Sequence, residues 1–321
     1  MTHPDWLEWL RGAATPTIRY LACRDLLGLP EADRELRADR DAIEREGPVP
    51  ALYAKQSPAG PWAVDKNYYQ PKYFSTHWTM TLLAELHADP ADPRFQHGAV
   101  HMLGATEGDI RQRQAQGAHG FSCLFGNILR YVLQAGLADD PRAQAMIDYA
   151  VRDLSGGPCV CAWNSEHRCG WGAVRTLYGL AALPAERRSP ALIAAVDRTL
   201  DFLLDSFHLE LADYPVPEGG SVHPLWFKLN FPLFYQTDIL FTLRVLSEWD
   251  ALDHPGASNA LDWLEAQRLE NGHWRGVSPY RQRTWRVFGG NEETMRWATL
   301  HAATVLKHAG RLQTAGTPLL M

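Results

Sequence analysis

Three cysteines and one histidine lie near the points where connecting segments lead into long apolar stretches. Cys123 and Cys169 each lie near the start of such a stretch, and Cys161 lies in the loop just before Cys169. His77 lies near the start of an earlier stretch. If these stretches are neighbouring helices that run the same way, their starts share one rim, and we expect the four side chains to meet there. Thiolates and imidazoles are ligands that zinc prefers.

This pattern therefore predicts a zinc site with Cys123, Cys161 and Cys169 as metal ligands. His77 would complete the tetrahedron, or it would act as a catalytic group beside an open coordination position. Two alternatives stay open, because the spacing Cys161-x7-Cys169 is not that of a zinc knuckle. The thiols could exchange protons without a metal, or they could simply pack in the core. Cys23 and Cys159 are interpreted as structural.

A carboxylate and a phenol mark the start of another apolar stretch, in Tyr235-Gln236-Thr237-Asp238. A lone aspartate that enters an apolar cavity has a raised pKa, as a general acid requires. Asp238 is therefore a candidate catalytic acid, with Tyr235 beside it. The alternative is structural: Asp238 would cap a helix or pair with Arg244 or Arg296.

Large aromatic residues lie near the starts of several apolar stretches. Their π faces could hold a hydrophobic substrate and stabilise a carbocation, although buried aromatic rings more often only fill a core. The candidate substrate-binding residues are Trp78, Phe125, Trp171 and Trp297.

The elements that must position these side chains form an internal repeat. Five segments are apolar nearly all round, as expected of helices that are buried on most sides: 72–86, 119–133, 167–181, 232–246 and 293–307. Residues 18–27 supply a weaker sixth copy. Amphipathic helices are predicted between them, several starting at Asp-Pro or Ser-Pro, where the first residue caps the helix and proline opens it: Asp92-Pro93, Asp140-Pro141 and Ser189-Pro190.

This alternation predicts an all-α, single-domain (α/α)6 toroid over residues 1–321, with about six helical hairpins around a central apolar cavity. An open solenoid is the structural alternative. Residues 1–50 are expected to form an N-terminal hairpin and a charged helix. Residues 208–231 form a connection longer than usual, which is a candidate lid over the cavity. No strand is expected.

Two short motifs share one pattern: Gln56 precedes Gly60-Pro-Trp62, and Gln267 precedes Gly272-His-Trp274. Glycine permits a sharp reversal after a helix, tryptophan covers the helix end, and the glutamine can bond free backbone groups there. These turns and the alternating helices resemble the terpene cyclase and protein prenyltransferase superfamily, which includes the squalene-hopene cyclases. The resemblance implies a deep cavity for a hydrophobic substrate such as an isoprenoid.

The chain also departs from this superfamily. Class II cyclases protonate an alkene with Asp-x-Asp-Asp, of which only Asp238 is present here. Protein prenyltransferases bind zinc through Cys, Asp and His near the same rim, but none of those ligands matches here residue by residue. Lanthionine cyclases are toroids with a Cys-Cys-His zinc, whose adjacent Cys-His pair is missing here. Linalool dehydratase-isomerase is a toroid with paired, metal-free cysteines that serve as acid and base.

Composition limits the remaining classes of function. The net charge is -6 and no basic stripe occurs, which argues against nucleic-acid binding. No apolar run is long enough for a transmembrane helix, and no signal peptide is recognised. With five cysteines, an odd number, we expect reduced thiols and a cytoplasmic location. The predicted function is cyclisation, isomerisation or transfer on a hydrophobic small molecule, with Zn²⁺ as the candidate cofactor. The alternative is a non-catalytic toroid that binds a lipid or a partner protein.

Overall fold

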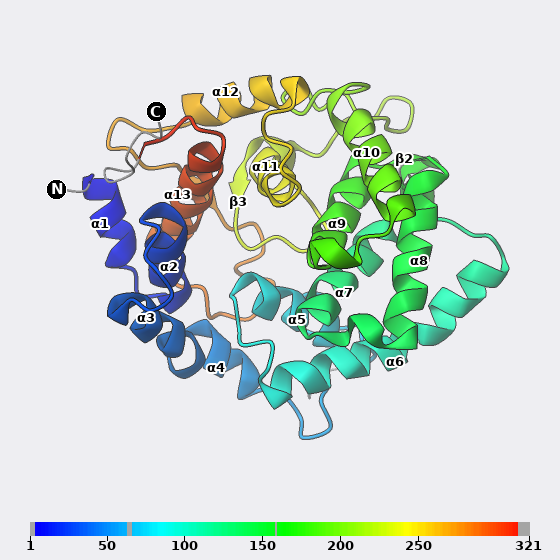
Figure 1. The fold of residues 1–321 in the computed structure, drawn as a ribbon, viewed down its shortest axis with the longest axis horizontal. Coiled ribbons are helices and arrows are strands. Elements are labelled where there is room, and N and C mark those ends of the chain that lie inside the picture. Colours follow the sequence, from blue (N-terminus) through cyan, green and yellow to red (C-terminus); the bar gives the residue numbers. More distant parts are fainter. Residues whose placement is uncertain (1–3, 63–65, 158, 314–321) are drawn as a thin grey trace.

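A computed structural model describes residues 4–62, 66–157 and 159–313 of the chain, and within these ranges helices dominate. Five predicted buried stretches form helices that lie nearer the middle of Figure 1: α5 (Thr76–Glu85), α7 (Ser122–Gln134), α9 (Gly170–Ala181), α11 (Ile239–Glu248) and α13 (Asn291–His308). The weaker sixth copy forms α2 (Pro16–Leu21) and the π-helical turn η1 (Ala22–Leu26).

The other helices lie toward the periphery in the same view. They are α1 (Asp5–Arg11), α3 (Arg34–Arg45), α4 (Pro48–Tyr53), α6 (Pro93–Ala115), α8 (Pro141–Ser155), α10 (Pro190–Leu204) and α12 (Ser258–Ala266). Short 3-10 turns join them: η2 (Leu137–Asp139), η3 (Ala162–Asn164), η4 (Ala185–Arg187), η5 (Pro224–Phe227) and η6 (Pro255–Ala257). The chain is therefore all-α in class, and the predicted charged helix of the N-terminal region is α3.

The predicted starts of the peripheral helices are correct. Asp92 and Asp140 each accept a hydrogen bond from a backbone N–H in the first turn of α6 and α8, and Ser189 does the same for α10. Each cap is followed by proline at the first helical position, where no backbone donor is needed.

The two glycine–tryptophan turns also form as predicted. Trp62 Nε1 donates to the Leu52 carbonyl at the end of α4, and Trp274 Nε1 donates to the Leu264 carbonyl in α12 (3.0 and 2.8 Å). Gln56 bonds the Gly60 carbonyl. The second turn differs by one residue.

In that second turn the bridge to Trp274 is made by Arg268, and it is Arg268 rather than Gln267 that donates to the Gly272 carbonyl. The prediction for Gln267 was therefore wrong. A longer spacer before Gly272 moves the next residue into the bonding position, and its guanidinium serves as well as an amide.

The expectation of no strands was also wrong in detail. The antiparallel pair β1 (Val160–Cys161) and β2 (His167–Arg168) precedes α9, and the parallel pair β3 (Leu229–Asn230) and β4 (Gly276–Val277) lies before α11 and α13. Pairs of two residues carry too little sequence pattern to be recognised.

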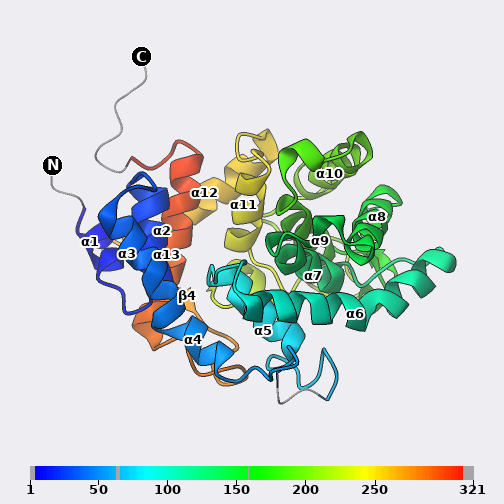
Figure 2. The same ribbon diagram turned by 60° about the horizontal axis from the view of Figure 1, so that its bottom comes forward.

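Contacts link consecutive central helices: α5 with α7, α7 with α9, α9 with α11, and α11 with α13. The N-terminal elements then contact both ends of this series. Thr15 Oγ1 donates to Glu293 on α13 (2.6 Å), and Thr17 Oγ1 donates to the Leu86 carbonyl after α5 (2.8 Å). Figures 1 and 2 both place α1 and α2 beside α13.

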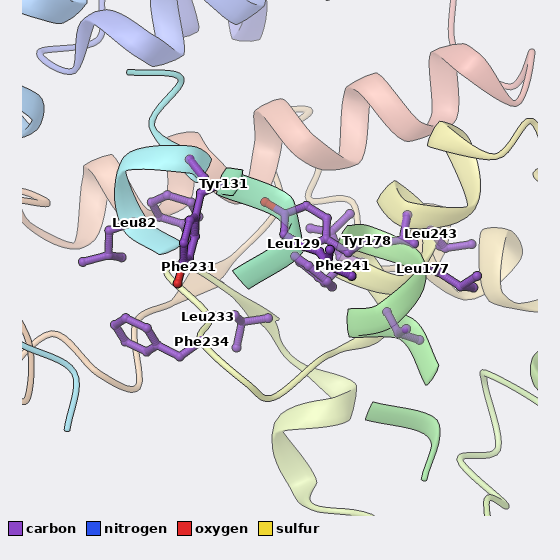
Figure 3. Packing of buried hydrophobic residues seen from close by; sticks show 14 of the residues in the cluster. Leu82, Leu129, Tyr131, Leu177, Tyr178, Phe231, Leu233, Phe234, Phe241 and Leu243 are labelled. Carbon is purple, nitrogen blue, oxygen red and sulfur yellow. The ribbon is translucent and has the colours of Figure 1, made fainter. Parts of the chain in front are cut away.

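Side chains from several central helices pack together in the core. Figure 3 shows leucine and aromatic side chains of α5, α7, α9 and α11, together with residues of the segment that leads into α11: Leu82, Leu129, Tyr131, Leu177, Tyr178, Phe241, Leu243, Phe231, Leu233 and Phe234. Among the described residues, no helix is long and apolar enough to cross a membrane.

The C-terminal ends of the central helices carry a buried ion pair. Glu85 of α5 accepts hydrogen bonds from Tyr178 of α9 and Arg244 of α11 (2.5 and 3.0 Å). Nearby, Arg130 of α7 pairs with Glu248 of α11. These charges tie four helices together at one end, opposite the helix starts that carry the predicted site.

Candidate functional site

A cavity of about 730 Å³ lies at the starts of α5, α7 and α9. It collects most of the residues that the sequence singled out: His77, Trp78, Cys123, Cys161, Cys169, Trp171 and Tyr235. The connection 208–231 supplies much of the remaining wall, including Tyr214, Val216, Val222, His223 and Trp226. Ligand cavities in proteins commonly have this size and this mainly apolar lining.

The hairpin of β1 and β2 brings two of the cysteines together. Cys161 pairs with His167, and the Cys169 N–H donates to the Cys159 carbonyl (3.1 Å). Because side chains alternate along a strand, Cys161 and Cys169 point to the same face of the hairpin. Their thiols lie close enough to affect each other's pKa.

The two thiols of this pair differ in acidity. The neighbouring Cys169 thiol, together with backbone N–H groups of Trp163 and Asn164, lowers the pKa of Cys161. Cys161 and burial raise the pKa of Cys169, although the Gly172 N–H points at its sulfur (3.4 Å). Cys161 is therefore the more acidic thiol of the pair, and Cys169 is the one that keeps its proton more readily.

Cys123 lies close enough to interact with this pair, and burial raises its pKa to about 11. The three sulfurs are nevertheless not arranged around one point. Among the described residues, the only three Cys, His, Asp or Glu ligand atoms that all lie within 4.8 Å of one another belong to Cys23, Glu35 and Asp39. Thiolates on one zinc lie about 2.3 Å from the metal, so as they stand the three cavity thiols do not fit one ion.

In the group of Cys23, Glu35 and Asp39, both carboxylates already form ion pairs with arginines. Arg11 donates to both oxygens of Glu35 (2.6 and 2.8 Å), and Arg19 donates to Asp39 (2.7 Å). These ion pairs tie α1 and α2 to α3, and Cys23 has the structural surroundings that the sequence indicated.

His77 is fully buried and presents a free nitrogen. Its Nδ1 lies 3.3 Å from the Tyr131 hydroxyl, whereas Nε2 has no hydrogen-bond partner. Burial, followed by the charge of Arg175, lowers the pKa of His77 to about 3. The imidazole is therefore neutral at physiological pH, and one of its nitrogens remains available to a ligand.

Sequence analysis missed the cation that causes part of this shift. Arg175 is completely buried in α9, where it donates to the Gln236 carbonyl and to Asn127 Oδ1 (3.1 and 3.3 Å). Its guanidinium lies 3.8 Å from the centre of the Phe241 ring, and no carboxylate is hydrogen bonded to it among the described residues. The sequence did contain a signal for this buried cation, because Arg175 is an arginine within the apolar stretch 167–181.

Tyr235 lies beside a second cation that the sequence analysis missed. Lys72 Nζ donates to the Tyr235 hydroxyl (3.2 Å) and lies 4.4 Å from the centre of its ring. The rings of Trp78 and Trp171 lie 6.1 and 6.2 Å from that of Tyr235. Two of the four predicted aromatic residues thus lie beside the phenol.

Asp238 lies outside the cavity lining. It caps α11 through the Phe241 N–H (2.6 Å) and accepts two hydrogen bonds from Asn230, from its N–H and its Nδ2 (2.8 and 2.7 Å). Burial raises the pKa of Asp238 to about 6. Of the proposed structural partners, Arg244 pairs with Glu85 and Arg296 with glutamates of α13, so capping is the observed role.

Two of the four aromatic candidates also lie outside this cavity. Phe125 packs on Tyr149 (ring centres 5.3 Å apart) and lines a smaller cavity of about 200 Å³. Trp297 stacks on Phe231 at 4.0 Å. Helical rotation explains both: the start of a helix reaches the rim, but only one face of that start points inward.

Neither a scan of protein-family models nor searches of curated proteins and of solved structures find a match to this chain.

Proposed function

We propose that the chain is an enzyme that transfers protons on a hydrophobic substrate, with Cys161 and Cys169 as the base and acid and His77 as a neutral partner. One observation carries this proposal: two neighbouring thiols that affect each other's pKa and an imidazole with an unpartnered Nε2 line the same aromatic cavity. Perturbed titratable groups in a largely apolar cavity are typical of active sites.

The proposal includes the closed (α/α)6 toroid. Contacts run through α5, α7, α9, α11 and α13 in turn, and α2 reaches both α13 and the end of α5. At the periphery, the Gly272 turn after α12 lies against Trp6 of α1. The buried Glu85–Arg244 pair would close the axis at one end, leaving the thiol cavity at the other.

The thiol pair suits an isomerisation or a loss of water. The Cys161 thiolate would take a proton from a substrate carbon, and the Cys169 thiol would return one to a second carbon or to a leaving hydroxyl. His77 would bond the substrate oxygen through Nε2. Among the described residues no aspartate or glutamate lines the cavity, which favours thiols over a carboxylic acid as the proton donor.

Hydrogen exchange with solvent tests this function. The protein would be incubated in D₂O with isoprenoid alcohols and alkenes, and deuterium in the recovered compound would be measured by mass spectrometry. We expect incorporation that is lost in Cys161→Ala and Cys169→Ala and kept in Cys23→Ala, whose thiol does not line the cavity. Bound substrate without exchange would favour the non-catalytic, lipid-binding alternative.

Zinc is a second candidate, favoured by the presence of all three thiols and the free His77 nitrogen on one cavity. Their present spacing would have to tighten for one ion to bind. Elemental analysis separates the two: about one zinc per chain, lost in Cys123→Ala or Cys169→Ala, would support the metal. Protein without zinc that still exchanges deuterium would exclude it.

A further inference from the structure

We propose that the cavity binds an amphiphile with a single carboxylate head group, and that the ammonium of Lys72 holds that head group. This inference rests on the proposed function, because it assigns the substrate class to the same cavity. It does not depend on the thiol chemistry.

The first support is the charge of the lining. Among the described residues that line the cavity, Lys72 is the one lysine or arginine, and there is no aspartate or glutamate. The guanidinium of Arg175 is buried behind the wall and acts on both His77 and Cys123. Apart from the Cys161 thiolate, the described lining therefore has no negative charge, and Lys72 is the charged group in it with which an anionic ligand can pair.

The second support is the geometry of Lys72. Its Nζ donates one hydrogen bond, to Tyr235, and lies over the rings of Tyr235 and Tyr73 at 4.4 and 5.3 Å. No ion pair joins Lys72 to a carboxylate of the described residues. An ammonium has three donors, so two remain for a ligand, and a half-buried cation that only faces aromatic rings gains from an anionic partner.

Two neutral groups of the cavity lining can donate hydrogen bonds to an anion. Burial raises the pKa of Tyr69 above its ordinary value and that of Cys123 to about 11, so both keep their protons at neutral pH. Tyr69 lies within electrostatic reach of Cys123 and Tyr235. A carboxylate in the cavity would thus meet O–H and S–H donors in addition to the Lys72 ammonium.

The number of charges limits the head group. A single ammonium balances a monocarboxylate, whereas a diphosphate would bring charges that the lining cannot neutralise. The apolar chain of the ligand would continue from Tyr235 along Trp171, whose ring lies 6.2 Å from that of His223 in the connection 208–231. Trp226 and Val222 extend this apolar wall.

Competition binding tests the inference. A fluorescent polyene fatty acid would be displaced by a long-chain carboxylic acid, its matching alcohol, its methyl ester and its monophosphate, at pH 7.5 and at low and high salt. We expect the acid to bind about tenfold or more tightly than the alcohol and ester. Lys72→Met should remove that preference while leaving alcohol binding nearly unchanged.

Lys228→Met is the matched control, because Lys228 is an exposed lysine outside the cavity lining. It should keep the full preference for the acid. An equal preference in Lys72→Met and the unchanged chain would overturn the inference, as would tighter binding of the phosphate than of the acid. Cys161→Ala should still bind the acid, so a failure of the thiol chemistry is distinguishable from a failure of the carboxylate site.

Discussion

The backbones of Gly126 and Arg175 touch. A Cβ atom added to Gly126 would lie 2.2 Å from the Arg175 carbonyl oxygen, and one added to Gly179 would lie 2.2 Å from the Gly126 carbonyl oxygen. Glycine at both positions therefore lets α7 and α9 pack closer than other side chains allow. This contact brings the starts of the two helices, with Cys123 and Cys169, to the same cavity.

Substitution of Gly126 should therefore be costly. Gly126→Ala forces the two helices apart, and we expect it to lower the free energy of unfolding by about 3 kcal/mol or more. Gly108→Ala is the matched control, because Gly108 also lies inside a helix but has no atom within 4 Å of an added Cβ. It should stabilise the protein by about 1 kcal/mol. Urea unfolding of both variants measures the difference, and equal effects would show that the close contact is not required.

Cys161 should react with an alkylating agent at a lower pH than an ordinary thiol. The neighbouring Cys169 thiol and two backbone N–H groups lower the pKa of Cys161 and so stabilise its thiolate. In Cys169→Ala the loss of the S–H donor should slow alkylation of Cys161 near neutral pH by about tenfold. The rate is followed by mass spectrometry of the Cys161 peptide between pH 5 and 10. An unchanged pH profile in Cys169→Ala would mean that the two thiols are independent.

Stability should fall as the pH drops below about 6.5. His77 and His301 are buried and neutral, and burial lowers both pKa values, that of His77 to about 3. Between the two pKa values of such a histidine, the unfolded chain binds a proton that the folded chain does not. Each such histidine then lowers the free energy of unfolding by up to about 1.4 kcal/mol for every unit by which the pH falls.

Two carboxyl groups modify this acid dependence. Burial raises the pKa of Glu85, but the effects of Arg244 and Tyr178 are larger and lower this pKa to about 2. The stability that ionised Glu85 contributes is therefore lost as the pH falls from about 4.5. Asp238 acts in the opposite direction, because its folded pKa is raised to about 6 and its contribution is lost as the pH rises through that value. The two histidines outweigh this single carboxyl between pH 6 and 5.

Urea unfolding at a series of pH values measures the acid dependence. His77→Gln should have a smaller slope than the unchanged chain between pH 6.5 and 4.5. His97→Gln, at an exposed position of α6, should keep the full slope. The same slope in both variants would show that His77 takes up a proton in the folded state.

Asp238→Asn should destabilise the fold. The carboxylate accepts three hydrogen bonds, whereas an amide presents an NH₂ group to at least one of the same donors. We expect a loss of about 1–3 kcal/mol in the free energy of unfolding at pH 7.5, and Asp201→Asn, at an exposed position of α10, should show almost none. Deuterium exchange should persist in folded Asp238→Asn. Its loss without loss of stability would restore Asp238 as the catalytic acid.

The sequence by itself determined which stretches form the central helices, and it determined the starts of three peripheral ones. The five apolar stretches, the Asp-Pro and Ser-Pro caps at Asp92, Asp140 and Ser189, and the packing of Trp62 and Trp274 on helix ends were predicted correctly. These features depend on side-chain periodicity and on hydrogen bonds between residues a few positions apart, so a single sequence contains the information they need. The expected starts of four central helices were too early, because α5 begins at Thr76, α7 at Ser122, α9 at Gly170 and α11 at Ile239.

Tertiary structure decided which candidates share a cavity. A hairpin of two short strands turns Cys161 toward Cys169, and the pairing of Asn230 with Asp238 takes that carboxylate out of the cavity lining. Lys72 and Arg175 become part of the site only because segments far apart in the chain pack beside them. Contacts over such separations depend on the rotation of each helix about its axis and on backbone approaches such as Gly126 to Arg175. Neither the rotation of a helix nor a close backbone approach can be derived from the spacing of residues. The helices could therefore be predicted, whereas the residues that form the site could not.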